Sequence, residues 1–237
     1  MWMFLLMLCI FAILKVQDFL KIYKRIQKMK KTPTTDIRYL DSGQFEVKAR
    51  ISSLSKKIES PLSQSECVWY SLIIKELVKQ GKSSTWKIRA NVQKCNLCII
   101  DDGTGTCQVD LSQIDFDLGT NYKGKSGTFD NPTTEEQHAL TNVGLDPETF
   151  FGFNKTLQYE EYILREGDEL YLLGNCKPIP KANNKMLMQG TPEKPLFVSD
   201  KSEAELIKKY ERKIWGHGFL IFIITSLIVG LLILNFT

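Results

Sequence analysis

The chain has 237 residues and a formal net charge of +4 at pH 7. The positive charge lies beside the two apolar ends, because residues 15–31 carry +6 and residues 201–213 carry +2, which leaves −4 for the rest. Phosphate contacts supply most of the affinity of complexes with nucleic acid, so this acidic remainder predicts no nucleic-acid partner. The length between the ends suits one domain of ordinary size.

The first apolar run, residues 1–14, carries no charge and predicts an N-terminal transmembrane helix. A cleavable signal peptide has a similar apolar core, but here no basic residue precedes the run and residues 13–18 offer no small-residue cleavage site. Lys15 can direct its charge to the interface while the residues after it extend the span. We therefore interpret residues 1–31 as an uncleaved span with a basic amphipathic extension, which Pro33 ends.

The second apolar run, residues 218–234, reaches the roughly 20-residue length of a spanning helix when its neighbours are included. Lysine and arginine follow the first run and precede the second, whereas the outer ends have none. In a plasma membrane, this asymmetry predicts a two-pass protein with a cytoplasmic central domain and both chain ends outside. The basic flanks either only set this topology or also bind anionic lipid headgroups.

Between the two ends, short strand-like segments separated by turn residues predict a mainly β domain with a few helices over residues 36–200, either a barrel or a sandwich. The strand-like segments are residues 44–51, 67–74, 85–88, 97–100, 106–110, 157–164, 169–174 and 196–199. The Asp101–Gly105 turn predicts a tight hairpin, because its glycines allow positive φ.

Residues 111–155 are predicted to be a polar loop that contains one short helix. Thr133 or Thr134 caps this helix, and Gly144 ends it. After the last strand, Ser202 begins a pattern like a capping box, so residues 201–237 are predicted to be a juxtamembrane helix that continues into the C-terminal span.

The six cysteines favour reduced, buried thiols over a disulfide framework. Cys95 and Cys98 have the spacing of half a zinc site or of a redox pair. No second Cys/His pair follows at a matching distance, so we predict a structural role for both. The sequence thus predicts no metal ion and no cofactor.

Other candidate groups also favour structural roles. Asp101 and Asp102 could bind a cation together with Asp110, but acidic residues in hairpin turns usually serve the turn. His138 is predicted on an exposed helix and leaves no convincing partner for a nucleophile. Three aromatic residues are predicted to be core rather than a ligand cage, namely Trp69, Tyr70 and Trp86. We expect no catalytic residue.

The insertion at residues 112–155 is longer than a chain reversal needs, and such loops are often functional. It contains the aromatic cluster Phe150, Phe151 and Phe153. One interpretation is that two rings cover a barrel end and the third is solvated. The other is that at least one ring anchors a partner chain, as aromatics do in interface hot spots. These three residues are the predicted partner surface.

Ser60-Pro61-Leu62-Ser63, followed by Cys67-Val68-Trp69-Tyr70, resembles the signature of the GIDE or BAM (beside-a-membrane) domain family. The similarity covers about residues 43–206. The residues to which it gives structural roles are Ser60, Pro61, Cys67, Tyr70, Gly103, Glu161, Gly167, Asp168 and Gly174. It implies a domain flanked by membrane helices. The family's best-known member is a mitochondrial outer-membrane ubiquitin ligase with two spans, this domain between them, and a RING finger after the second.

The sequence departs from that member in its zinc ligands. A RING needs eight Cys/His ligands on one compact segment, whereas the six Cys and two His here are scattered and include Cys9 and His217 in or beside the apolar ends. We therefore interpret the chain as a prokaryotic-type member without a RING.

These observations predict a non-enzymatic, membrane-tethered scaffold that holds a protein partner, or a copy of itself, against the bilayer. One alternative is a sensor whose barrel mouth binds a small molecule or a lipid headgroup. A third hypothesis, a ubiquitin-ligase-like enzyme, is disfavoured by the ligand count. An aromatic-lined hollow would favour the sensor, and a flat exposed apolar patch the scaffold.

Overall fold

The computed structural model describes residues 2–54, 58–147, 154–180 and 185–236. The chain divides into two compact units. One comprises residues 34–200, and the other joins residues 1–33 to residues 201–237. The two units are distinct because most of their contacts join residues of the same unit.

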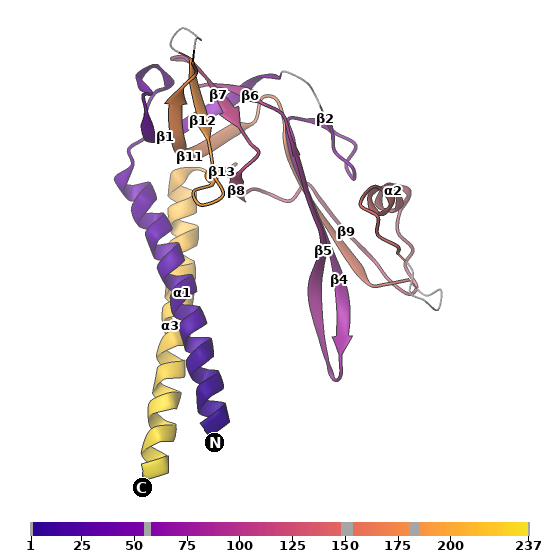
Figure 1. Cartoon of the computed structure of the whole chain (residues 1–237), viewed down its shortest axis with the longest axis vertical. Coiled ribbons are helices and arrows are strands. Elements are labelled where there is room, and N and C mark those ends of the chain that lie inside the picture. Colours follow the sequence, from indigo (N-terminus) through magenta and orange to yellow (C-terminus); the bar gives the residue numbers. More distant parts are fainter. Residues whose placement is uncertain (1, 55–57, 148–153, 181–184, 237) are drawn as a thin grey trace. The chain divides into compact units, whose positions relative to one another are not determined.

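The helical unit consists of α1 (Trp2–Lys31) and α3 (Glu203–Phe236), which run antiparallel and contact each other (Figure 1). Lys30 and Glu211 form an ion pair of 2.8 Å between the two helices. The Arg25 guanidinium donates to the Tyr210 hydroxyl at 3.2 Å and lies over its ring. α1 ends just before Pro33, as predicted.

The start of α3 is a capping box. The Glu205 amide donates to the Ser202 hydroxyl, and the Ser202 amide donates to the Glu205 carboxylate. Within the described ranges, α3 is the helix whose length and apolar composition suffice to cross a membrane, over Glu203–Ile233. The apolar run of α1 is interrupted from Lys15 onward, so its span stays a prediction.

Five strands of the larger unit form a closed barrel in the order β1-β6-β7-β12-β11, because β11 also pairs with β1. The strands are β1 (Gly43–Leu54), β6 (Cys98–Asp101), β7 (Thr106–Asp110), β11 (Glu169–Pro178) and β12 (Met186–Gln189). All these pairs are antiparallel except β7–β12. Side chains such as Val47, Ile100, Val109 and Leu172 fill the barrel interior.

Two further strands extend the barrel sheet. β13 (Leu196–Ser199) pairs with β11, and β8 (Ile114–Asp117) pairs in parallel with β13. The 3-10 helix η1 (Ile37–Tyr39) contacts β7 at one end of the barrel. The predicted mainly β domain is confirmed, and of the two predicted alternatives, barrel and sandwich, the structure has the barrel.

The chain between the barrel strands builds a second, four-stranded sheet in the order β5-β4-β10-β9. Its strands are β4 (Trp69–Gln80), β5 (Ser83–Cys95), β9 (Tyr122–Ser126) and β10 (Leu157–Leu164). Helix α2 (Thr134–Asn142) covers one face, where Leu140 packs with Leu72, Ile74 and Tyr159. At the other end of this sheet, the cross-strand pair Trp69 and Leu164 lies in the barrel core and joins the two sheets.

The structure corrects the prediction for residues 111–155. Their described part, residues 111–147 and 154–155, contains β8, β9 and α2, and is not one polar loop with a helix. The strands were missed because aspartate, which is depleted in strands, supplies two of the four residues of β8, and because glycine and lysine dominate β9. The helix prediction is confirmed, since Thr133 caps α2 and Gly144 follows its end with φ +69°.

Candidate functional site

Five residues of the family motif meet beside the start of β4. β2 (Ile58–Glu59) and β3 (Glu66–Cys67) form a small ribbon whose connecting turn carries Ser60 and Pro61. The fully buried Glu161 side chain of β10 points into this turn. Its carboxylate accepts hydrogen bonds from the Leu62 amide (2.8 Å), the Ser63 amide (3.0 Å) and the Ser63 hydroxyl. Glu161 therefore supplies the hydrogen bonds that hold the turn in place.

The Ser60 side chain completes the same network. Its hydroxyl lies 2.8 Å from the Ser63 hydroxyl and accepts from the Ser65 amide at 3.2 Å. Arg165 donates to the Ser65 hydroxyl from the strand end after Glu161. The motif thus fixes a buried carboxylate against a turn whose amides would otherwise be unpaired.

Cys67 and Tyr70 lie in the small apolar cluster next to Glu161, together with Ile58 and Ile163. Burial, and to a lesser extent the Glu161 charge, raise the pKa of the Cys67 thiol to about 11, and the Arg165 charge opposes this shift. Burial likewise raises the pKa of Tyr70, with Cys67 and Glu161 adding to the shift. A thiol with this pKa is protonated at neutral pH and is a poor nucleophile.

The remaining motif residues lie apart from this cluster and shape turns or packing. Gly103 and Gly167 occupy hairpin turns with φ of +84° and +87°. Asp168 accepts from the Arg165 amide at 2.7 Å and closes the β10–β11 turn. Gly174 lies in β11 against the buried Leu196, and a Cβ at this position would overlap the Leu196 side chain.

The acidic turn between β6 and β7 binds backbone amides. Asp102 accepts from the Thr104 amide (2.8 Å), the Gly105 amide (3.2 Å) and the Ile37 amide (2.7 Å), so it also attaches η1 to the barrel. Partial burial raises the pKa of Asp102, but these N–H donors and the Thr104 hydroxyl outweigh burial and lower it overall. Asp101 accepts from the Gly103 amide at 2.7 Å.

Cys95 and Cys98, for which we predicted a structural role, lie against and in the barrel core. Cys98 is buried in the barrel, and burial, with Cys107 nearby, raises its pKa to about 12. Cys107 and Cys176 share a hydrogen bond in the same core, which together with burial raises the pKa of Cys176. Among the described residues, no group of three or more His, Cys, Asp and Glu side chains is arranged to hold a metal ion.

The aromatic predictions have mixed outcomes. Trp69 is fully buried, as expected, and Tyr70 is partly buried. The prediction for Trp86 is wrong, because 38% of this residue is exposed on the edge strand β5. Phe150, Phe151 and Phe153 lie outside the described residues, so the partner surface stays a prediction. His138 lies exposed on α2, as expected.

Two buried carboxylates were not singled out from the sequence. Glu46 of β1 accepts from the Thr34 hydroxyl at 2.6 Å and from the Tyr171 hydroxyl. Glu136 of α2 accepts from the Tyr122 hydroxyl and the Thr133 amide, both at 3.0 Å. The Thr-x-x-Glu spacing of a capping box was a usable signal for Glu136. Glu46 had no such signal.

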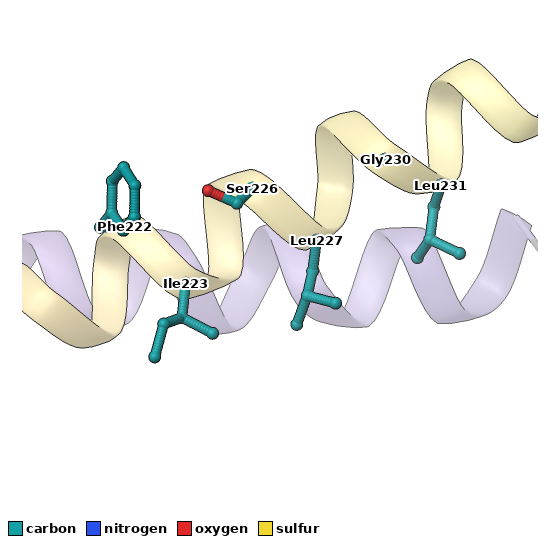
Figure 2. A pocket seen from close by; sticks show the side chains of 6 residues that line it. All are labelled: Phe222, Ile223, Ser226, Leu227, Gly230 and Leu231. Carbon is teal, nitrogen blue, oxygen red and sulfur yellow. The ribbon is translucent and has the colours of Figure 1, made fainter.

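Two of the hollows that the described residues line bear on the alternative functions. One, of about 420 Å³, lies at the barrel end near η1, where Arg38, Asp41, Thr106 and Met186 are among its lining residues and none of that lining is aromatic. The other is an open groove along α3, where Ser226 and Gly230 leave space between larger apolar side chains (Figure 2). Neither hollow brings together a nucleophile and a base.

A comparison of the whole sequence with models of known protein families identifies the family. A family model described as GIDE, E3 ubiquitin ligase, matches residues 73–233. The chain belongs to the GIDE family. Searches among curated proteins and among solved structures found no match.

The matched GIDE range contains Gly103, Glu161, Gly167, Asp168 and Gly174. The turn that Glu161 holds precedes the matched range. Glu161, which lies inside the range, therefore fixes a segment that lies before residue 73. The match also includes most of α3, so the family pattern extends through the apolar helix.

Proposed function

We propose that this chain is a membrane-tethered, non-enzymatic interaction module that holds a protein partner, or a second copy of itself, beside the bilayer. The observation that carries the proposal is that the motif residues serve hydrogen bonding and packing inside the domain. Glu161 and Ser60 fix a turn, Gly174 allows close packing, and the thiols of Cys98 and Cys107 fill the core. In the described part of the chain, these residues serve packing and hydrogen bonding, as the residues of a rigid interaction module would.

The tether follows directly from the end of the domain. Three residues separate the end of β13 from the start of α3, which is long and apolar enough to cross a membrane. We further propose that α1 is a second span and that the basic flanks place the domain in the cytoplasm, with both termini outside.

The family description names a ubiquitin ligase, but we propose no ligase activity for this chain. A RING binds two zinc ions through eight Cys/His ligands on one segment. Here the ligand types are dispersed, and Cys98, Cys107 and Cys176 are used in the barrel core.

The hollow near η1 supports the second candidate, a sensor of a small molecule or headgroup. Its volume of about 420 Å³ falls in the range of ligand sites. Its described lining lacks the aromatic side chains that the sensor hypothesis called for, so we favour the interaction module.

The test uses the predicted partner surface. Phe150→Ala, Phe151→Ala and Phe153→Ala, made singly in the full chain, should weaken partner binding or self-association by about 30-fold or more if the ring is an anchor. Association is measured by sedimentation in detergent and by crosslinking in native membranes, and the melting temperature is recorded in parallel. Phe129→Ala is the control, because Phe129 belongs to the same insertion and is fully exposed. Loss of stability without loss of association in all three variants would refute this surface.

A further inference from the structure

We infer that the tip of the β4–β5 hairpin is a contact site for an anionic lipid surface. The inference goes beyond the proposed module, because it names a ligand for a surface that the scaffold hypothesis does not use. It is carried by the geometry of the hairpin, by its charge, and by its exposed apolar side chains.

The hairpin is longer than the sheet that supports it. β10 pairs with β4 only as far as Glu76, whereas β5 remains paired to Gln80. The hairpin end therefore extends past the sheet as a two-stranded ribbon (Figure 1). A two-residue turn at Gly81-Lys82 closes it, with φ +62° at the glycine.

One face of this ribbon is apolar and uncovered. The cross-strand pairs Leu77–Trp86 and Lys75–Ile88 place these four side chains on the same face. Trp86 is 38% exposed and Ile88 is 60% exposed. We call Leu77, Trp86 and Ile88 the hairpin patch. Indole rings with one apolar and one polar edge are enriched where membrane meets water.

The hairpin is strongly basic on an acidic unit. Residues 69–95 contain six Lys or Arg and one acid, a formal charge of +5, whereas the rest of residues 34–200 contains 13 basic and 22 acidic side chains. Lys75 and Arg89 form ion pairs with Glu160 and Glu76. The other four basic side chains have no ion pair within the described part of the chain, and they are Lys79, Lys82, Lys87 and Lys94.

This combination of groups favours a lipid surface over the other occupants of an exposed strand. Lys87, Arg89 and Lys94 lie on the edge strand β5, and charged residues there oppose the addition of a partner strand. The unit carries a net charge of −9 outside the hairpin and −4 overall, which opposes wrapping by nucleic acid. Clustered lysine beside exposed tryptophan matches the chemistry of anionic headgroups at an apolar interface.

The experiment places a polarity-sensitive nitrobenzoxadiazole probe near the patch. The probe is attached at Ser84→Cys, because Ser84 lies opposite Lys79 at the hairpin end. The chain also carries Cys9→Ser, which removes the exposed native thiol. The labelled full chain is reconstituted into phosphatidylcholine vesicles with or without about 30 mol % phosphatidylserine. We expect higher probe emission in the anionic vesicles. A probe at Asn142→Cys, on the exposed end of α2, should not respond.

A matched pair of charge variants tests the electrostatic part. The probe emission in anionic vesicles gives the ratio of chains whose hairpin contacts the lipid to chains whose hairpin does not. Lys82→Gln with Lys87→Gln should lower this ratio about fivefold for each lysine removed. Lys123→Gln with Lys125→Gln changes the net charge equally, on exposed residues of β9 in the same sheet, and should leave the ratio unchanged. Because all four lysines are exposed, we expect unchanged melting temperatures.

Each of the following results would overturn the inference. They are equal emission in both vesicles, equal effects of the two charge variants, and emission that rises with a short single-stranded oligonucleotide instead of with phosphatidylserine. A signal that depends on the protein-to-lipid ratio in neutral vesicles would point to a second copy and would also overturn it. If the chain fails to float with neutral vesicles, the proposed tether is wrong. The hairpin inference is then decided by flotation with anionic vesicles, which the Lys82→Gln, Lys87→Gln variant should lose and the Lys123→Gln, Lys125→Gln variant should keep.

Discussion

Buried carboxylates are the residue-scale feature that distinguishes this domain. Glu46, Glu136 and Glu161 are each almost inaccessible to solvent, and each accepts hydrogen bonds from amides or hydroxyls on another segment. A buried carboxylate costs stability unless such donors surround it. Glu161 was identified from the sequence only through the family resemblance. Glu46 looks like any solvent-facing residue of an alternating strand, so its partners Thr34 and Tyr171 were needed to recognise it.

The Glu161 network predicts a large difference between two adjacent substitutions. Glu161→Gln puts an amide NH₂ against donors from Leu62 and Ser63, so we expect the free energy of unfolding to fall by about 2–4 kcal/mol. Glu160→Gln removes a partly exposed ion pair with Lys75 and should cost about 1 kcal/mol or less. Chemical denaturation of both variants in detergent measures the difference. Equal losses would show that the network does not stabilise the turn.

Asp102 predicts a pH-dependent stability difference. Its pKa is lowered in the folded chain from the ordinary 3.8, so its contribution is complete above about pH 4 and is lost as the pH falls through the folded pKa. Asp102→Asn should therefore lower the free energy of unfolding by about 1–2 kcal/mol at pH 7, with a smaller difference from the parent below about pH 4. Denaturation curves at pH 7 and pH 3.5 test this. A difference that persists at low pH would contradict the charge-assisted bonds to Ile37 and Thr104.

At the element scale, hairpins were predictable and inserted strands were not. The β6–β7 hairpin follows from its acidic glycine turn, and α2 follows from its cap. β8 and β9 have weaker local signals, because Asp, Gly and Lys, which are depleted in strands, make up half or more of their residues. Gly124 of β9 is required by a distant contact, since a Cβ there would overlap the Glu136 carboxylate. A local reading cannot detect a constraint set by another element.

Gly190 after β12 provides an element-scale prediction. A Cβ at Gly190 would overlap the carbonyl oxygen of Gln113 and the amide nitrogen of Leu196, which hydrogen-bond to each other at 3.0 Å. Gly190→Ala must therefore separate these backbone segments, and we expect a loss of about 3 kcal/mol in the free energy of unfolding. Gly127→Ala is the control, because its Cβ would make an ordinary contact with Thr156, and it should cost less than about 0.5 kcal/mol. Thermal melts compare the two variants, and similar melting temperatures would contradict the close packing.

At the scale of the whole molecule, the sequence indicated a barrel or a sandwich but not how the barrel closes. Closure pairs Gly43–Arg50 with Glu169–Cys176, which no local pattern specifies. The parallel pairing of β7 with β12 is equally non-local. The C-terminal helix that is long and apolar enough to cross a membrane was the most predictable feature, because a long apolar run needs no tertiary context.

The proposed topology predicts opposite accessibility for two positions. Single cysteines introduced by Ser83→Cys and Thr237→Cys in a cysteine-free chain are treated with an impermeant thiol reagent on intact cells. The position at 237 should label from outside, and the position at 83 should label only after permeabilisation. Labelling at 83 in intact cells would refute the cytoplasmic assignment. Protection at both positions would refute the outside C-terminus.

The late position of the barrel-closing strands sets the order of events during synthesis. β1 must wait for β11, more than 100 residues later, and α3 is the next helix to leave the ribosome. The 34 residues of α3 take about 2–7 s to translate at ordinary elongation rates, whereas β-rich domains fold in milliseconds to seconds. Closure of the barrel and synthesis of the apolar helix that follows it therefore fall on overlapping timescales.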